Sequence, residues 1–180
     1  LHVGPSTLSP VDLTDRGDGH GVDVHSIASE ELADADVAPR QARAARNSLE
    51  SNGLRVRHLT TTSADTACPG SSILVALDYA DTHAGFSALG EPGKPAEDVG
   101  EAAATAALAY HEGTPVVDRH MADQVLVFLA LAGGEAVVPA ITDHVATSLE
   151  LLDRFDVSVT VDDDHPEASR LVVDRPLDVA

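Results

Sequence analysis

VVDRHMADQVLVFLALAGG, residues 116–134, is the stretch that decides the fold of this 180-residue chain. Its polar opening, which starts at Asp118, leads into the run VLVFLALA, and Gly133 and Gly134 follow that run. A run that is apolar nearly all round predicts a buried helix, with Asp118 as the cap and the two glycines as the stop. A buried strand stays open as the alternative, because periodicity alone does not separate the two.

A second helix is predicted downstream, in TDHVATSLELLDRF at residues 142–155. Thr142 or Asp143 would cap it, and Val145, Leu149 and Leu152 form an i, i+4, i+7 apolar stripe that predicts one buried face. Two strands are then predicted at residues 157–161 and 170–174, on either side of the charged turn DDDHPEAS.

The upstream half alternates strand and helix signals. Residues 1–13 are punctuated by proline and glycine and predict an extended edge strand. The further elements predicted upstream are a strand at 22–27, a helix at 37–52, strands at 54–59, 73–77 and 85–89, and a helix at 96–110. Together these elements predict an α+β fold.

The charge balance is extreme, with 30 acidic residues against 11 basic ones and a formal net charge of −19. An acidic tail would gather its carboxylates in one block, whereas here they are spread along the chain and Lys94 is the only lysine. Spread acidity indicates a surface adapted to a high-salt cytoplasm, where screening removes most of the self-repulsion. Any contact with RNA would then depend on local arginines and backbone N–H groups.

Several classes of site are disfavoured. Cys68 is the only cysteine, so no disulfide framework and no cysteine-based metal site is expected, and a structural thiol is the favoured interpretation of Cys68. The nine histidines lack metal-ligand spacing, and no metal site is predicted. No apolar run is long enough to span a membrane, and we expect a cytoplasmic protein.

Two segments could carry chemistry. In the first, His120, Met121, Ala122, Asp123 and Gln124 open an otherwise apolar helix, and buried polar groups there need partners. They either cap a surface end of the helix or hydrogen-bond a ligand.

The second segment places His144 in the first turn of a helix, where free N–H groups and the helix dipole favour a phosphate. The helix end also favours the neutral, nucleophilic imidazole, while Asp143 opposes this effect. A histidine beside a cap is usually only a neighbour of that cap, so a nucleophilic His144 is the sharper of two open interpretations.

These two segments, in this order and spacing, resemble the paired C-terminal signature of the RNA 3′-terminal phosphate cyclases. Four further stretches are similar to the family in the kind of residues they contain and in their order along the chain. They are PSTLSPVDLTDRG, VAPRQARAARNSL, ACPGSSILVAL and FSALGEPGKPAEDVGEAAA. The resemblance covers nearly the whole chain.

The resemblance implies a fold and a reaction. The fold would be a βαβαββ-type core repeat with a small inserted β-α-β-β domain. Residues 1–13 would end a preceding repeat, 14–88 would form the insert and 89–180 the C-terminal repeat. In the family, a histidine attacks the α-phosphate of ATP with Mg²⁺ present, AMP passes to an RNA 3′-phosphate, and the adjacent 2′-hydroxyl closes a 2′,3′-cyclic phosphate. That histidine falls on His144, and the adenylate-contacting stretch falls on residues 120–124.

The resemblance also has departures and rivals. Ser148 stands where the family has asparagine. The N-terminal segments that complete the family's ATP and RNA sites have no counterpart here, so the chain is expected to need that part of the protein for activity. The rivals are a cyclase-like ribosome-assembly protein without catalysis, which would lack the histidine, and a free-standing binding module.

Overall fold

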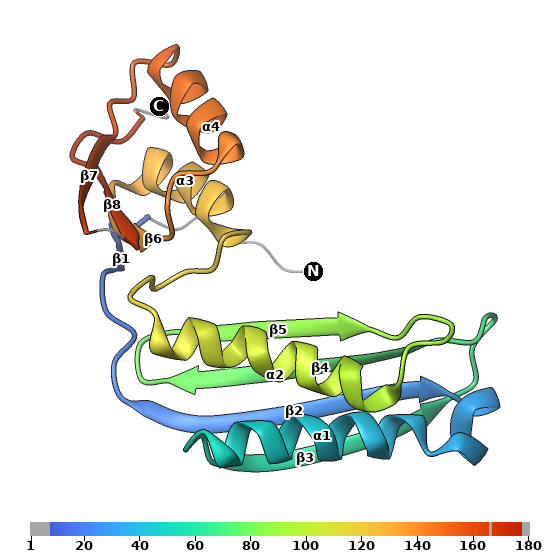
Figure 1. Cartoon of the computed structure of the whole chain (residues 1–180). Coiled ribbons are helices and arrows are strands. Elements are labelled where there is room, and N and C mark those ends of the chain that lie inside the picture. The colour runs from blue at the N-terminus through green and yellow to red at the C-terminus, as the bar shows by residue number, and fades with distance from the viewer. Residues whose placement is uncertain (1–7, 166, 178–180) are drawn as a thin grey trace. The chain divides into compact units, whose positions relative to one another are not determined.

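The computed structural model describes residues 8–165 and 167–177, and the chain divides into two compact units. The first unit comprises the described residues up to Asp15 and from Gly113 onward. The second unit is Arg16–Glu112. Each unit has its own sheet and its own hydrophobic core (Figure 1).

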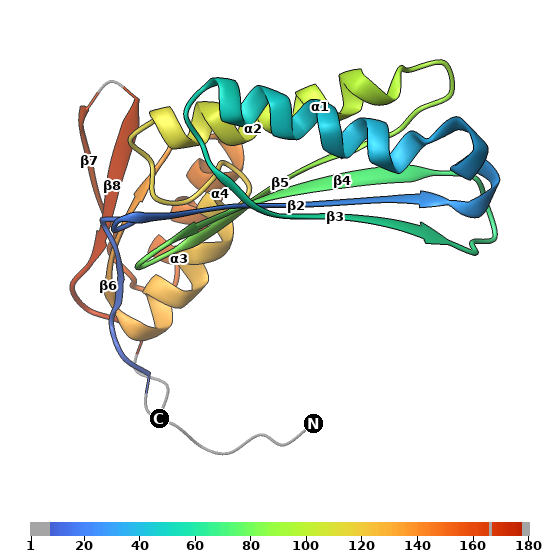
Figure 2. The ribbon, with the colours of Figure 1, turned by 90° about the horizontal axis from the view of Figure 1, so that it is seen from below.

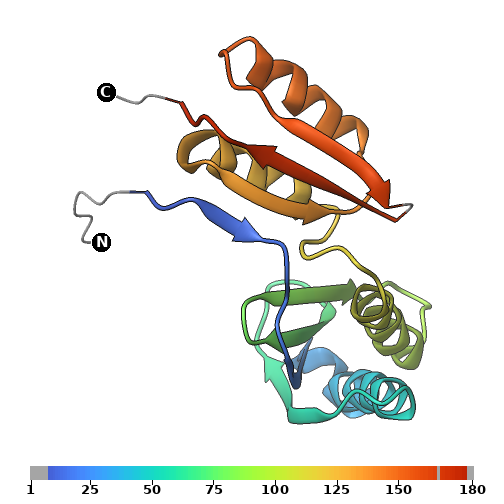
Figure 3. The ribbon, with the colours of Figure 1, turned by 90° about the vertical axis from the view of Figure 1, so that its left-hand side faces the viewer.

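The first unit has the element order βαβαββ. Its elements are β1 (Val11–Leu13), α3 (Met121–Ala132), β6 (Gly134–Val138), α4 (Asp143–Asp153), β7 (Thr160–His165) and β8 (Ala168–Val173). The strand order is β1-β6-β8-β7, with β1 parallel to β6 and the remaining neighbours antiparallel. Figure 3 shows α3 and α4 on the same side of this sheet.

The decisive apolar run forms a helix, so the strand alternative is wrong. Leu126 and Leu129 are buried in the core of the first unit together with Val145 of α4 and Leu171 of β8. The prediction that this helix is buried all round holds for one face only. Val127 is 56% exposed and Phe128 is 58% exposed, because within this unit α3 packs on one side.

The second unit is a four-stranded sheet covered by helices on one face (Figure 2). Its elements are β2 (Gly19–Ser29), the short 3-10 helix η1 (Glu30–Ala35), α1 (Val37–Ser51), β3 (Val56–Ala64), β4 (Ser71–Tyr79), β5 (His83–Leu89) and α2 (Ala96–Glu112). The order is β3-β2-β4-β5, with β2 and β3 parallel across α1 and the other pairs antiparallel.

Small residues let α1 and α2 approach closely over this sheet. Ala42 and Ala45 of α1 and Ala104 and Ala107 of α2 are fully buried. A Cβ at Gly100 of α2 would collide with the backbone carbonyl of Gln41. The alanine-rich composition of both helices therefore reflects close helix–helix packing as well as helix propensity.

The second unit starts at Arg16, two residues from the predicted start of the insert at 14, but it ends at Glu112 and not at the predicted residue 88. Residues 8–13 were predicted to end a preceding repeat, and the structure corrects this. Strand β1 pairs with β6, so the described residues before Asp15 share a sheet with the C-terminal elements. Helix α2 packs on α1, β4 and β5, so the second unit ends at Glu112. The sequence predicts a helix over 96–110 but carries no local signal for the sheet on which it packs.

No helix in the described part of the chain combines the length and the hydropathy that a membrane crossing requires.

Candidate functional site

Helix α4 begins with a side-chain cap. The backbone of Thr142 is extended (φ −84°, ψ 165°), and its Oγ1 accepts a hydrogen bond from the Val145 N–H at 3.3 Å. The Thr142 carbonyl accepts from the Ala146 N–H at 2.9 Å. Of the two residues that the sequence offered as caps, the structure selects Thr142.

His144 lies in the first turn of α4 with an exposed side chain. The next residue, Val145, is completely buried in the core of the first unit. Because consecutive helical residues point about 100° apart, the burial of Val145 directs His144 away from that core. The imidazole is therefore accessible to a ligand.

Helix α3 begins with a different cap. Asp118 Oδ1 accepts hydrogen bonds from the backbone N–H groups of His120 (2.7 Å) and Met121 (2.9 Å). The Nε2 of Gln124 donates to the His120 carbonyl at 3.1 Å. Asp118 and one end of the Gln124 amide thus serve the helix itself, as the capping interpretation predicts.

The interpretation that residues 120–124 bind a ligand stays a prediction. The structure shows which of their side chains are exposed and could contact one. The side chains of His120 and Gln124 are exposed, and Asp123 is half-buried. Met121 is 42% exposed, whereas Ala122 is buried in the core and can offer a ligand only its backbone.

The two helix starts belong to the same unit, and α3 packs against α4. Ala122 and Val145, the sequence neighbours of Asp123 and His144, lie in one hydrophobic cluster. The fold thus anchors both predicted site segments in a common core and leaves their polar side chains toward solvent. Within the described residues, no group of three or more metal-ligating side chains gathers.

Comparison with known proteins supports the resemblance. Residues 14–112 match the family model of the RNA 3′-terminal phosphate cyclase insert domain. The RNA 3′-terminal phosphate cyclase of Halobacterium salinarum is 41% identical over 162 residues, which cover 90% of this chain and 45% of the relative. The cyclase of Pyrococcus furiosus is 37% identical over 121 residues (67% of this chain, 35% of the relative). That of Methylococcus capsulatus is 32% identical over 154 residues (84% of this chain, 42% of the relative).

The chain belongs to the RNA 3′-terminal phosphate cyclase family. It spans less than half the length of these relatives. A relative from Halobacterium also fits the salt-adapted interpretation of the −19 net charge. The matched insert model ends at residue 112, where the second structural unit ends, so the second unit is the cyclase insert.

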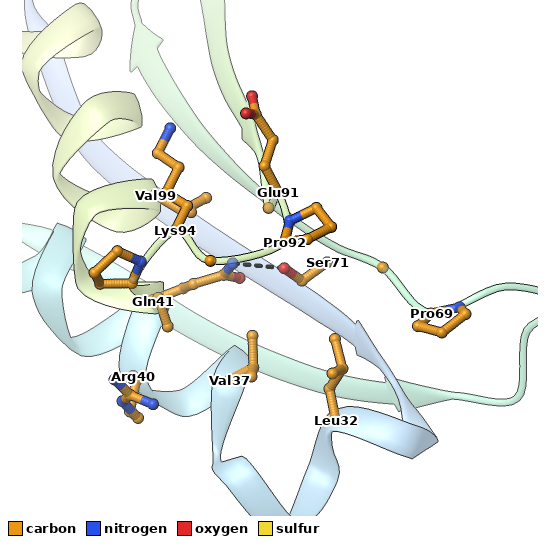
Figure 4. Close-up of a pocket in the computed structure, with 15 residues that line it drawn as sticks. Leu32, Val37, Arg40, Gln41, Pro69, Ser71, Glu91, Pro92, Lys94 and Val99 are labelled. Carbon is orange, nitrogen blue, oxygen red and sulfur yellow. Dashed lines mark hydrogen bonds between the residues drawn. The ribbon is translucent and has the colours of Figure 1, made fainter.

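The insert contains a pocket that the sequence did not reveal. It has a volume of about 430 Å³ and lies where the starts of α1, β4 and α2 meet, with Gln41 and Val99 among its lining residues (Figure 4). The Gln41 side chain accepts from Ser26 Oγ (2.9 Å) and donates to Ser71 Oγ (2.8 Å). One side of the pocket is further fixed by Arg40, which donates two 2.7 Å hydrogen bonds to the Glu97 carboxylate.

The charges around this pocket balance. Arg40 is neutralised by Glu97, and Lys94 shares the lining with Glu91. The hydrogen bond from Arg40 lowers the pKa of the Glu97 carboxyl below its ordinary value, so the pair is ionised at neutral pH. In the sequence, this pocket is signalled only by polar residues within the alanine-rich segment that forms α1. Such residues are found on solvated helix faces as well, so the sequence does not show that the Gln41 amide is buried.

Proposed function

We propose that this chain is part of an ATP-dependent enzyme that converts an RNA 3′-phosphate into a 2′,3′-cyclic phosphate through an AMP bound to His144. The observation that carries the proposal is the exposed imidazole of His144 on the first turn of α4, in a chain that belongs to the cyclase family.

The reaction divides into three displacements at phosphorus. An imidazole nitrogen of His144 attacks the α-phosphate of ATP, and the bond to pyrophosphate breaks. An oxygen of the RNA 3′-phosphate then attacks the same phosphorus and releases His144, which leaves an RNA 3′-phosphate joined to AMP. Finally the adjacent 2′-hydroxyl attacks the RNA phosphorus, loses its proton and expels AMP.

The start of α4 suits the first displacement. The N–H groups of a first helical turn point at a bound anion, and the helix dipole favours the charge that develops on the α-phosphate. The residues proposed to contact the adenylate are His120, Met121, Ala122, Asp123 and Gln124. Ala122 would do so through its backbone, since its side chain is buried.

Mg²⁺ would offset the charge of the ATP phosphates. This cation keeps several waters and usually binds through one or two carboxylates plus substrate phosphates, so a full cage of protein ligands is not required. Asp143, exposed next to His144, is the carboxylate of this segment that fits such a role.

The rest of the protein is part of the proposal. The chain spans 45% of the Halobacterium relative, so we propose that the catalytic unit also needs the part of the cyclase outside the matched region. The exposed apolar side chains of Val127 and Phe128 on α3 are consistent with a further surface packing there.

The test supplies ATP labelled at the α-phosphate, with Mg²⁺, to this chain and to the chain completed with the remaining part of the Halobacterium cyclase. We expect acid-labile label on the completed protein and complete loss of the label in His144→Ala. The matched control is His25→Ala, which removes an exposed histidine from β2 of the insert and should keep the label.

Two outcomes would count against the enzyme. A folded, completed protein that takes no label would favour the cyclase-like ribosome-assembly protein without catalysis. Label that survives in His144→Ala would show that another residue is the nucleophile.

A further inference from the structure

Strand β3 forms one edge of the insert sheet, beside β2 (Figure 1). It is nine residues long, and its residues 57–63 are all exposed. An edge strand presents a row of backbone N–H and C=O groups that can pair with another strand, and proteins usually protect it with lysine, proline, a bulge or a short length. β3 contains neither lysine nor proline, and the register irregularity of the β2–β3 pair lies near its start, at Val22 and Asp23. The strand is therefore an open template for pairing.

The opposite edge of the same sheet, β5, is a weaker template. It has seven residues and contains Gly85, and a glycine inside a strand weakens that strand. β3 instead carries Val56 and three consecutive threonines at 60–62, which are residue types that favour strands. Of the two edges, β3 is the one built to accept a further strand.

The charges along β3 suit a second copy of the same strand. Residues 51–64 contain no acidic residue, although 30 of the 180 residues of the chain are acidic. Arg57 is neutralised within its own chain, because its guanidinium lies 3.2 Å from the Asp23 carboxylate and 2.8 Å from that of Asp78. Two copies of β3 can therefore approach each other without opposing carboxylates, despite the net charge of −19 on each chain.

Two exposed residues of opposite charge flank β3 at equal distances from its midpoint. Arg55 precedes the strand and Asp65 follows it, each five positions from Thr60. No ion pair joins either of them to another described residue. When two β3 strands pair antiparallel about Thr60, Arg55 of each copy lies opposite Asp65 of the other copy. The strand is thus complementary to itself in one particular register.

We propose that β3 is a homodimer interface, in which two copies of the chain pair their β3 strands antiparallel about Thr60 and join the two inserts into one continuous sheet. In this register His58 faces Thr62 of the second copy and Thr60 faces its own counterpart, so no like charges lie directly opposite each other. One two-fold contact covers the open edge of both copies. This inference concerns the insert alone and does not depend on the proposed reaction.

The experiment is sedimentation equilibrium of the 180-residue chain at about 0.3 M potassium chloride, which screens long-range repulsion between acidic chains and leaves a direct ion pair effective. An interface of one strand pair is small, so we expect a dissociation constant in roughly the micromolar range. Arg55→Glu and Asp65→Arg should each raise it by roughly tenfold or more, because each change creates like-charge contacts at both symmetric ends. The double variant restores opposite charges and should dimerise like wild type. The matched control is Arg43→Glu, the same charge reversal at an exposed position of α1, which should leave the dimer unchanged.

Disulfide trapping tests the register. Thr60→Cys is made together with Cys68→Ser, which removes the only native cysteine. Residues directly opposite in an antiparallel pair have Cβ atoms about 4.5–5.5 Å apart, so mild oxidation should trap a covalent dimer through position 60. The matched control is Ser87→Cys in the same background, at an exposed position of the other edge strand, and it should stay uncrosslinked.

Each outcome decides the inference. A wild-type chain that is monomeric throughout the micromolar range overturns the interface. A dimer that Arg55→Glu weakens no more than Arg43→Glu does would place the contact elsewhere and overturn it as well. A double charge reversal that stays monomeric, or a Ser87→Cys variant that crosslinks more readily than Thr60→Cys, overturns the antiparallel pairing about Thr60.

Discussion

At the scale of single residues, Gln41 shows how one buried amide organises the insert. Its side chain is fully buried in α1 and bonds to Ser26 of β2 and Ser71 of β4. Buried polar groups are tolerated when every member of the network has a partner. Among the described residues no buried side-chain nitrogen or oxygen lacks one, so Gln41 joins the helix to two strands without an uncompensated polar atom.

Gln41→Met tests this network. The change keeps the volume and leaves the buried Ser26 hydroxyl without its acceptor, so we expect a loss of about 1–3 kcal/mol in the free energy of unfolding. Urea denaturation followed by tyrosine fluorescence is the measurement, since the chain has no tryptophan and both tyrosines, Tyr79 and Tyr110, lie in the insert. The control is Asn47→Ala, at an exposed position of the same helix. Equal stability of Gln41→Met and wild type would refute the network's role.

The sequence anticipated the outline of the candidate site at this scale but not the network around Gln41. His144 was predicted at a helix start and lies there with an exposed ring, because a threonine cap and an apolar i, i+4 stripe are local signals. Gln41 was missed because its partners are 15 and 30 residues away along the chain. Contacts of that kind leave no periodicity in the sequence.

At the scale of elements, the α1–α2 contact depends on Gly100. A Cβ at this position would meet the carbonyl of Gln41 in the facing helix, so Gly100→Ala should push the helices apart and lower the free energy of unfolding by about 1–3 kcal/mol. Gly70→Ala is the matched control, because nothing lies within 4 Å of a Cβ there and its φ is not positive. Urea denaturation reports both variants. A Gly100→Ala protein as stable as the control would show that the helices adjust freely.

The ion pair between Arg40 of α1 and Glu97 of α2 predicts a dependence on pH. The hydrogen bond from Arg40 holds the pKa of the Glu97 carboxyl below the ordinary value of a glutamate. A carboxyl whose pKa is lowered by folding stabilises the protein above its unfolded pKa, and this stabilisation is lost as the pH falls through the folded pKa. The effect is small because both side chains are substantially exposed.

Arg40→Gln should therefore be less stable than wild type near neutral pH. The difference should shrink as the pH falls below the ordinary pKa of a glutamate and vanish below the lowered pKa of Glu97. Urea denaturation across this pH range measures the difference, and a ¹³C titration of the Glu97 carboxyl should show its pKa rising in the variant. A stability difference that stays constant at acid pH would assign the loss to the arginine's packing instead of its charge.

The sequence largely predicted which segments are helices and which are strands. It did not predict which elements pack or pair with one another. The strands predicted at 22–27, 54–59, 73–77 and 85–89 became β2, β3, β4 and β5. The apolar run and the apolar stripe after it became α3 and α4, because period and composition are local properties. Strand β6 was missed because it has five residues and begins at Gly134, the second of the two glycines predicted only to end the preceding helix. The placement of α2 was missed because its alanine-rich surface fits any closely packed helix or sheet.

At the scale of the whole molecule, the net charge of −19 makes stability a function of salt. Like charges destabilise the compact state, and their screening length shrinks from about 10 Å at 0.1 M salt to about 3 Å at 1 M. The free energy of unfolding should therefore rise steeply up to about 1 M potassium chloride, where screening is nearly complete.

A variant with fewer charges separates screening from salting-out. The triple substitution Glu30→Gln, Glu31→Gln and Asp34→Asn removes three exposed carboxylates from η1. Screening predicts that this variant is more stable than wild type at low salt and that the two converge as salt rises. Salting-out acts through buried apolar surface, which the substitutions leave unchanged, so it predicts parallel curves that keep rising at high salt. Convergence in urea denaturation at several potassium chloride concentrations would establish self-repulsion as the source of the salt dependence, and parallel curves would refute it.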